Sequence, residues 1–269
     1  EALGGCVLDA DAVYHQLLEE DGDLRRALES LPVEGFAVEI SRVKKSGLDV
    51  CDFSVVLDAA HENHDHDMAY LHGQGGASEH GHDHDHGHAH DHDHAHGARG
   101  PAEIAQIIDG AAMADGAKAI AHRMFGFVAD AEARAHGVPV GEVHFHEVGA
   151  VDSIADIIAI AVAADDLAPD GVVVSDLPCG YGTVRCQHGL IPVPAPATAF
   201  IAEAAGLTLS PVDVEGELVT PTGAAAAAAL RTEAALPERF SIKAIGMGAG
   251  KRAYDTPGIL RAMIIEPAE

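Results

Sequence analysis

An internal tract of histidine and aspartate limits most strongly what this chain can fold into. Histidine occupies every second position from His80 to His96. Between Asp83 and His96 there is no large apolar side chain, so the tract cannot contribute to a hydrophobic core. We therefore expect a disordered loop over residues 60–98 that interrupts a chain of 269 residues. Its internal position and its interleaved aspartates argue against an expression tag.

The tract has the composition of a metal-binding segment. Thirteen of the 19 histidines lie between His61 and His96. Neutral imidazole is a good ligand for borderline cations such as nickel, copper and zinc, and a dense array can hold several ions weakly and exchange them. The residues of the tract do not reveal which metal is bound. The predicted ligands are His80, His82, His84, His86, His88, His90, His92, His94 and His96.

The composition of the whole chain is that of a folded protein with an aliphatic core. The chain is 48% hydrophobic but only 4% aromatic, and it contains no tryptophan, so the core must be built from Ala, Val, Ile and Leu. The formal net charge of −27 argues against binding to nucleic acid or to an anionic membrane. Such an acidic surface is compatible with attracting metal cations, and equally with solubility or adaptation to salt.

Cysteine usage and hydropathy favour a cytoplasmic protein. The four cysteines contain no CxxC pair, which indicates a reducing compartment rather than a disulfide framework. No apolar run reaches the length of a membrane span, and no signal peptide is evident. The sequence starts at Glu1 rather than at methionine, which limits the argument on targeting. The oligomeric state stays open, and a homo-oligomer is one of the options.

The apolar patterns predict alternating helices and strands. This alternation favours an α/β or α+β fold, with a mixed sheet, packed helices and a disordered His-rich loop. We expect a small subdomain over 1–59, the loop over 60–98 and an α/β main domain over 99–269. Helical patterns cover 9–30, 101–108, 115–135, 151–167, 197–205 and 221–231, and strand patterns cover 36–43, 52–57, 172–175, 240–245 and 259–265.

The segment HFHEVGAVD, residues 144–152, carries the sharpest chemical signal outside the tract. In an extended chain His144 and His146 point to one side, and the phenylalanine between them points to the core. With Glu147 and Asp152 they form a plausible ligand set for nickel, zinc or iron, or an acid–base group around a bound ligand. Alternatively, Asp152 is only a helix N-cap and the histidines are structural.

The glycine-rich segment from Cys179 to Gly189 offers two thiols, an arginine and a histidine. Its glycines allow a ligand to approach the backbone closely. A Cys/Cys/His metal site is one interpretation. Without a CxxC pair, however, the pattern favours Cys179 and Cys186 as buried apolar residues of a β-hairpin. Arg185 and His188 are better candidates for contact with an anion or ligand.

Two further segments suit the binding of phosphate or carboxylate. Thr220 and Thr222 lie at the predicted start of a helix, where exposed N–H groups attract anions. Ordinary capping by threonine is the alternative. The glycine-rich stretch 246–252 includes Lys251, but it matches neither the P-loop nor the GxGxxG pattern, so a plain glycine turn is the alternative there.

Four stretches of the chain together resemble a known family. They occur in the order HFHEVGAVDSIADI from His144, HGLIPVPAPAT from His188, GELVTPTGAA from Gly216 and GMGAGKR from Gly246. Preceded by a His-rich insertion, they are similar to the amino-terminal region of LarC, the nickel insertion proteins of nickel-pincer cofactor biosynthesis. The resemblance covers nearly the whole chain, and its specificity lies in the four motifs in this order.

The resemblance implies part of a CTP-dependent nickel insertase of the lyase class that serves lactate racemase maturation. Such an enzyme inserts Ni(II) into pyridinium-3,5-bisthiocarboxylic acid mononucleotide. One nickel–carbon and two nickel–sulfur bonds form, and CTP is hydrolysed to CMP. The His-rich tract would store or deliver nickel.

The sequence departs from the family pattern in three places. It lacks the expected DCFSGISGDM-like start, and it ends where the CTP-binding carboxy-terminal domain, a partner in the reaction, should follow. It also reads GAGKRA from Gly248 where the family has GAGxRD, and Pro257-Gly258 where a PN turn is expected. Asp255 is the candidate to replace the missing acid. We therefore expect that this chain alone does not hydrolyse CTP.

The resemblance also suggests roles for the candidate residues. The nickel ligands, or the base that accepts the pyridinium ring proton, would be His144, His146, Glu147 and Asp152. The contacts to the phosphate and thiocarboxylates would be Arg185, His188, Thr220, Thr222 and Lys251. Two alternatives are a nickel or zinc storage or chaperone protein without chemistry of its own, and a metallohydrolase that holds a metal-bound water.

Overall fold

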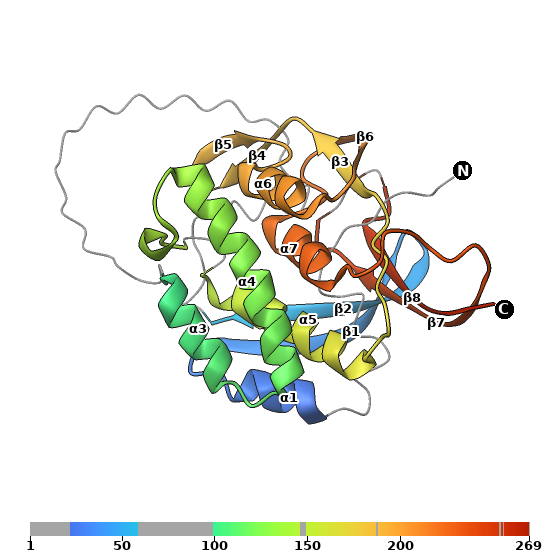
Figure 1. Cartoon of the computed structure of the whole chain (residues 1–269), viewed down its shortest axis with the longest axis horizontal. Helices are drawn as coiled ribbons and strands as arrows, with labels where there is room; N and C mark the ends of the chain where they lie inside the picture. The colour runs from blue at the N-terminus through green and yellow to red at the C-terminus, as the bar shows by residue number, and fades with distance from the viewer. Residues whose placement is uncertain are drawn as a thin grey trace.

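The computed structural model describes residues 22–58, 99–145, 149–186, 188–252, 254 and 256–268. The His-rich tract, with its predicted ligands and its predicted disorder, lies outside the described residues. So do His146, Glu147 and Asp255. Within the described ranges the fold is α+β, with six α-helices packed against a mixed sheet (Figure 1). The predicted fold class is confirmed, whereas the predicted domain boundaries remain a prediction.

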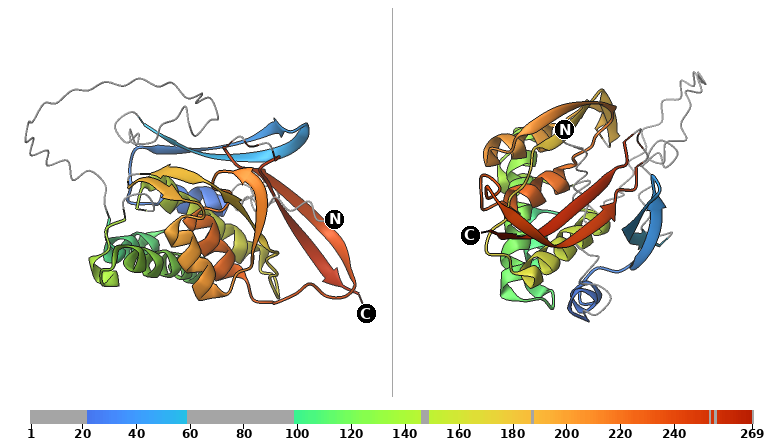
Figure 2. Two further views of the ribbon diagram at one scale, coloured as in Figure 1. Left: turned by 90° about the horizontal axis from the view of Figure 1, so that it is seen from above. Right: turned by 90° about the vertical axis from the view of Figure 1, so that its right-hand side faces the viewer.

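The principal sheet joins two hairpins that lie far apart in the sequence (Figure 2). One consists of the antiparallel strands β1 (Phe36–Lys45) and β2 (Leu48–Leu57), the other of β7 (Phe240–Ala249) and β8 (Ile259–Pro267). The strand order is β1-β2-β7-β8, and β2 runs parallel to β7. This pairing brings the end of β7 beside the first hairpin.

The helices are α1 (Gly22–Glu29), α3 (Pro101–Gly110), α4 (Asp115–His136), α5 (Val151–Leu167), α6 (Pro196–Ala205) and α7 (Pro221–Leu230). Proline opens α3, α6 and α7, where its missing N–H removes no intrahelical bond. Gly137 and Gly206 end α4 and α6 in the left-handed conformation, which glycine adopts without strain. These signals explain why the helices predicted from residue 101 onward agree with the structure. The helical prediction over 9–30 is confirmed only for residues 22–29, because residues 9–21 lie outside the described residues.

Helix α5 lies at the centre of the hydrophobic core. It contacts α1, α4, α7 and strand β2, and Ile154, Ile157 and Ile158 on it are fully buried. The facing helices α4 and α7 are rich in alanine, which allows the helix backbones to approach closely. The expected core of aliphatic side chains is therefore present, and it also contains a few larger side chains such as Phe145 and Met124.

One predicted strand, residues 172–175, is wrong. Only Val173 pairs there, through an isolated bridge to Glu233, because the chain is bonded to the loop after α7 rather than to a sheet. The strand begins later, as β3 (Leu177–Tyr181), parallel to β6 (Leu209–Glu215). A further hairpin consists of β4 (Thr183–Cys186) and β5 (Gly189–Pro192).

The first part of the glycine-rich stretch 246–252 is a strand rather than a turn. Residues 246–249 continue β7 and pair with β8.

In the described part of the chain, no helix is both long enough and apolar enough to cross a membrane.

Candidate functional site

The segment after α4 and its short 3-10 turn η2 (Val140–Glu142) approaches the core at Phe145. Phe145 is 2% exposed and packs edge-to-face on Phe125, with ring centroids 6.4 Å apart. The neighbouring His144 is exposed. The predicted alternation is therefore confirmed for this pair, and the His144 imidazole is accessible to a ligand.

Arg99 connects the residues on both sides of positions 146–148. Its carbonyl oxygen accepts a hydrogen bond from the Phe145 amide at 3.0 Å. Its guanidinium Nη1 donates to the Gly149 carbonyl at 2.6 Å, while Nε lies 3.3 Å from the carboxylate of Glu103. A Cβ at Gly149 would lie 2.6 Å from the Phe145 carbonyl oxygen, so the close approach requires glycine. The backbone flanking the candidate ligands is thus fixed at two points.

Asp152 lies in the first turn of α5, but it is not the N-cap. That position belongs to Ala150, and no side chain caps it. The interpretation of Asp152 as only an N-cap is therefore wrong. Its Oδ1 is inaccessible to solvent, and the residue lies at the positive end of the helix dipole. This leaves a half-buried carboxylate close in sequence to His144.

The β4–β5 hairpin carries Arg185, Cys186 and His188. Arg185 and His188 are exposed. The His188 Nδ1 lies 3.8 Å from the Cys186 sulfur, and its ring lies 4.9 Å from that of His136 at the end of α4. The expectation that both cysteines lie in one hairpin is wrong, because Cys179 is in β3.

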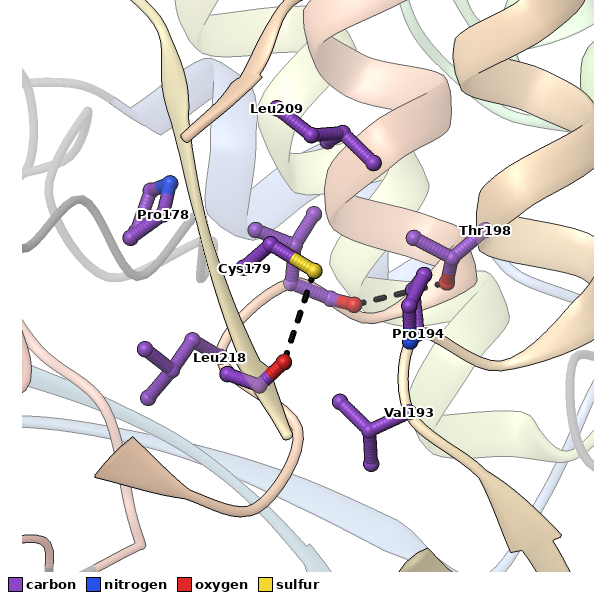
Figure 3. A pocket seen from close by; sticks show the side chains of 9 residues that line it. Pro178, Cys179, Val193, Pro194, Thr198, Leu209 and Leu218 are labelled. Atoms are coloured by element: carbon purple, nitrogen blue, oxygen red, sulfur yellow. Dashed lines mark hydrogen bonds between the residues drawn. The ribbon is translucent and has the colours of Figure 1, made fainter. Parts of the chain in front are cut away.

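A small pocket, lined mainly by apolar side chains, opens beside Cys179 (Figure 3). Thr198 projects into this region and donates a hydrogen bond to the Val219 carbonyl at 3.3 Å. Burial raises the pKa of the Cys179 thiol, which keeps the lining neutral. Sequence reasoning missed Thr198, which stands in an apolar helix pattern. The lining residues are Pro178, Cys179, Gly180, Val193, Pro194, Thr198, Leu209, Leu218 and Val219.

Glu217, next to this pocket, is 8% exposed and is held by residues that follow β7. Arg252 Nη1 lies 3.4 Å from Glu217 Oε2, and the Tyr254 hydroxyl donates to the Glu217 carbonyl oxygen at 2.5 Å. Burial alone would lower the pKa of Arg252, but Tyr254 and Glu217 raise it by more, so the guanidinium stays charged. Sequence reasoning missed Glu217, since no pattern marks one carboxylate as buried.

The two threonines and the lysine that the sequence predicts as anion contacts have defined surroundings. Thr220 is the N-cap of α7, and its hydroxyl accepts a hydrogen bond from the Gly223 amide at 3.2 Å, so the capping alternative is confirmed. Thr222 is half-buried in the first turn. Lys251 forms an ion pair with Asp52, so an anion at Lys251 would compete with this carboxylate.

The structure therefore brings Gly216 and Glu217 next to Arg252 and Tyr254. It also places His188 of the hairpin against His136 at the end of α4. In the described ranges, no three His, Cys, Asp or Glu side chains are already arranged around one metal ion.

Comparison with known proteins gives a consistent result. A family model described as "Nickel insertion protein" matches residues 12–269. A protein of Alkaliphilus metalliredigens, named pyridinium-3,5-bisthiocarboxylic acid mononucleotide nickel insertion protein, is 44% identical over 263 residues, covering 96% of this chain and 58% of the relative. A protein of Geobacillus kaustophilus with the same name is 36% identical over 242 residues, covering 89% and 52%. The chain thus spans little more than half the length of these relatives. No solved structure matches it.

Proposed function

Because this chain belongs to the family of nickel insertion proteins, we propose that it is the nickel-handling part of an enzyme that inserts nickel into pyridinium-3,5-bisthiocarboxylic acid mononucleotide. The observation that carries the proposal is the 44% identity over 263 residues with a relative whose name states this reaction. We assign the CTP-dependent step to the part of the relatives that this chain does not cover.

The chemistry needs a base and a set of exchangeable nickel ligands. A nickel–carbon bond replaces a ring C–H bond, so a group on the protein must accept the proton. Nickel itself is the cargo and prefers imidazole, thiolate and carboxylate donors. We assign these tasks to the segment from His144 to Asp152, with His146 and Glu147 between them. The Arg99 contacts support this assignment, because they hold the flanking backbone in place.

The anionic groups of the substrate require cations and N–H donors. Arg185, Thr222 and Lys251 supply accessible or half-buried groups, and Thr220 orients the first turn of α7 through its capping bond. Such contacts would hold a phosphate or thiocarboxylate in a protein whose net charge otherwise repels anions. His188, by contrast, lies beside a thiol and a second imidazole, which suits a metal ion better than an anion.

A storage or chaperone protein without chemistry of its own is the second candidate. The His-rich tract favours it, because such an array can bind several ions without an ordered site.

Calorimetric titration of Ni(II) separates the two functions. The titrations compare the chain with a variant in which residues 60–97 are replaced by a short Gly/Ser linker. The insertion proposal expects a site that survives the replacement and weakens in His144→Ala. Loss of all nickel binding in the linker variant would instead identify a metal-collecting protein.

A further inference from the structure

We propose a second, ordered metal site where the carboxyl end of α4 meets the β4–β5 hairpin, formed by Glu132, His136, Cys186 and His188. These residues belong to neither the His-rich tract nor the segment from His144 to Asp152. They come from two elements that are adjacent at the upper end of α4 (Figure 1). Two imidazoles, one thiol and one carboxylate form a donor set for a borderline divalent cation such as nickel, cobalt or zinc.

The four residues form two pairs, Cys186 with His188 and Glu132 with His136. The distance between the donor atoms of each pair fits two ligands of one ion. Two donors on one tetrahedral metal lie roughly 3.5 Å apart for sulfur with nitrogen, and roughly 3.3 Å apart for nitrogen with oxygen. Cys186 Sγ lies 3.8 Å from His188 Nδ1, and Glu132 Oε2 lies 3.4 Å from His136 Nε2. Each pair therefore needs little adjustment to bind one ion.

The contact between the imidazoles brings the two pairs together. Their ring centroids are 4.9 Å apart, and the planes are inclined by 45°. Two imidazoles bound to one tetrahedral ion have centroids roughly 5 Å apart, given metal–nitrogen bonds of about 2.0 Å. The separation of the two rings is therefore compatible with a shared ion, once the donor atoms turn toward it.

The position at the end of a long helix also favours a cation. Helix α4 has 22 residues, and His136 is its last residue, beside the negative end of the helix dipole. Arg134, the nearest cation on the same turn, is turned toward α6, where it pairs with Glu203 at 2.6 Å and lies over Phe200. A metal ion here meets no opposing guanidinium from α4.

Metal binding requires a change in side-chain rotamers, because the four donors do not yet surround one point. The change is feasible because the side chains of His136 and Glu132 are 36% and 20% exposed, and His188 is exposed on a hairpin. On binding, the Cys186 thiol loses its proton to solvent and the metal–sulfur bond forms, without oxidation or reduction.

The choice of nickel as the physiological ion rests on the proposed function. The assignment of the four residues as metal ligands does not depend on that function. In this arrangement His188 binds metal, and Arg185 on the same hairpin remains the contact for a substrate anion. A site with a thiolate ligand would be distinguishable from the His-rich tract by its sulfur donor, because no cysteine lies between Cys51 and Cys179.

Titration of the whole chain with Co(II) under reducing conditions tests the site. Thiolate-to-cobalt charge transfer absorbs in the near ultraviolet, and imidazole or carboxylate ligands of the His-rich tract do not produce this band. We expect the band in the wild-type chain and its loss in Cys186→Ser, His188→Ala and His136→Ala. The matched control Cys179→Ser removes the other thiol that is partly exposed among the described residues, and it should keep the band.

Absence of the band in the wild-type chain, or its persistence in Cys186→Ser, overturns the proposal. Circular dichroism of each variant, compared with the wild type, separates loss of a ligand from loss of the fold. The result does not decide the proposed function, because the nickel titration with His144→Ala reports on a different segment. The cobalt band can therefore be absent while His144→Ala still weakens nickel binding, and the reverse.

Discussion

The guanidinium of Arg99 donates a hydrogen bond to the carbonyl oxygen of Gly149, a residue 50 positions away in the chain. Gly149 is buried, so this charged donor satisfies a carbonyl that water does not reach easily. Arg99 also bonds Phe145 through its backbone. The two contacts bracket the positions at which the candidate ligands His146 and Glu147 occur.

Substitution Arg99→Ala should lower the free energy of unfolding by about 1.5–3 kcal/mol, the usual contribution of a hydrogen bond to a charged group. Urea denaturation measures the change. Arg25→Ala is the control, because within the described ranges Arg25 forms only an exposed ion pair at 4.0 Å, and its loss should cost under about 1 kcal/mol. Equal effects of the two substitutions would refute a structural role for the Arg99 bond.

Substitution Gly149→Ala should be destabilising for a steric reason. The added Cβ would lie 2.6 Å from the Phe145 carbonyl oxygen, closer than real contacts allow, so backbone must shift. Gly126 in α4 has open space around the same position, and Gly126→Ala should stabilise the chain by about 0.5–1 kcal/mol. Thermal melts of the two variants should therefore shift in opposite directions.

Substitution Thr220→Ala removes the side-chain cap of α7 and should cost about 1 kcal/mol of stability. Thr220→Ser keeps the hydroxyl that accepts the Gly223 amide, and it should retain most of the stability. Denaturant titrations of both variants check this. If serine were as destabilising as alanine, the methyl group rather than the cap would be the important part of Thr220.

The Cys179 thiol should react slowly with iodoacetamide in the folded chain. Burial raises its pKa above the ordinary value of 9.0, and only the thiolate is reactive. The folded state keeps a neutral thiol to higher pH than the unfolded state. Its contribution to stability is therefore complete below 9.0 and is lost as pH rises through the folded pKa.

Mass spectrometry of the Cys179 peptide gives the alkylation rate as a function of pH. The inflection in the folded chain should lie at higher pH than in the chain denatured by urea, where the same thiol is exposed. Coincident inflections would show that burial does not protect it.

The sequence predicted those parts of the fold that have local causes. Proline at the start and glycine at the end of α6 set its bounds, and the alternation of His144 and Phe145 placed the phenylalanine in the core. Strand β3 was missed because Pro178 and Gly180 interrupt its pattern. The parallel pairing of β2 with β7 could not be predicted, because it depends on packing between distant segments.

The candidate sites show the same difference between residues that are close in sequence and residues that only the fold brings together. The residues of the segment 144–152 were found because they are close in sequence. His136 was missed as a neighbour of His188, because one residue ends a helix and the other lies in a hairpin much later in the chain. Nothing near either residue in the sequence indicates that the two rings meet.

The pairing of β2 with β7 has a consequence for how the chain is made. Lys45, which ends β1 at the turn of the first hairpin, donates a hydrogen bond to the carbonyl oxygen of Arg252, 207 positions later. At about 5–20 residues per second, the ribosome needs roughly 10–40 seconds to synthesise that stretch. During this interval the first hairpin has no neighbouring strand, and it depends on packing against helices such as α5, because a hairpin alone is only marginally stable in water. In a chain truncated before β7, the first hairpin would lack its neighbouring strand permanently. The two hairpins of the sheet therefore need to be produced together.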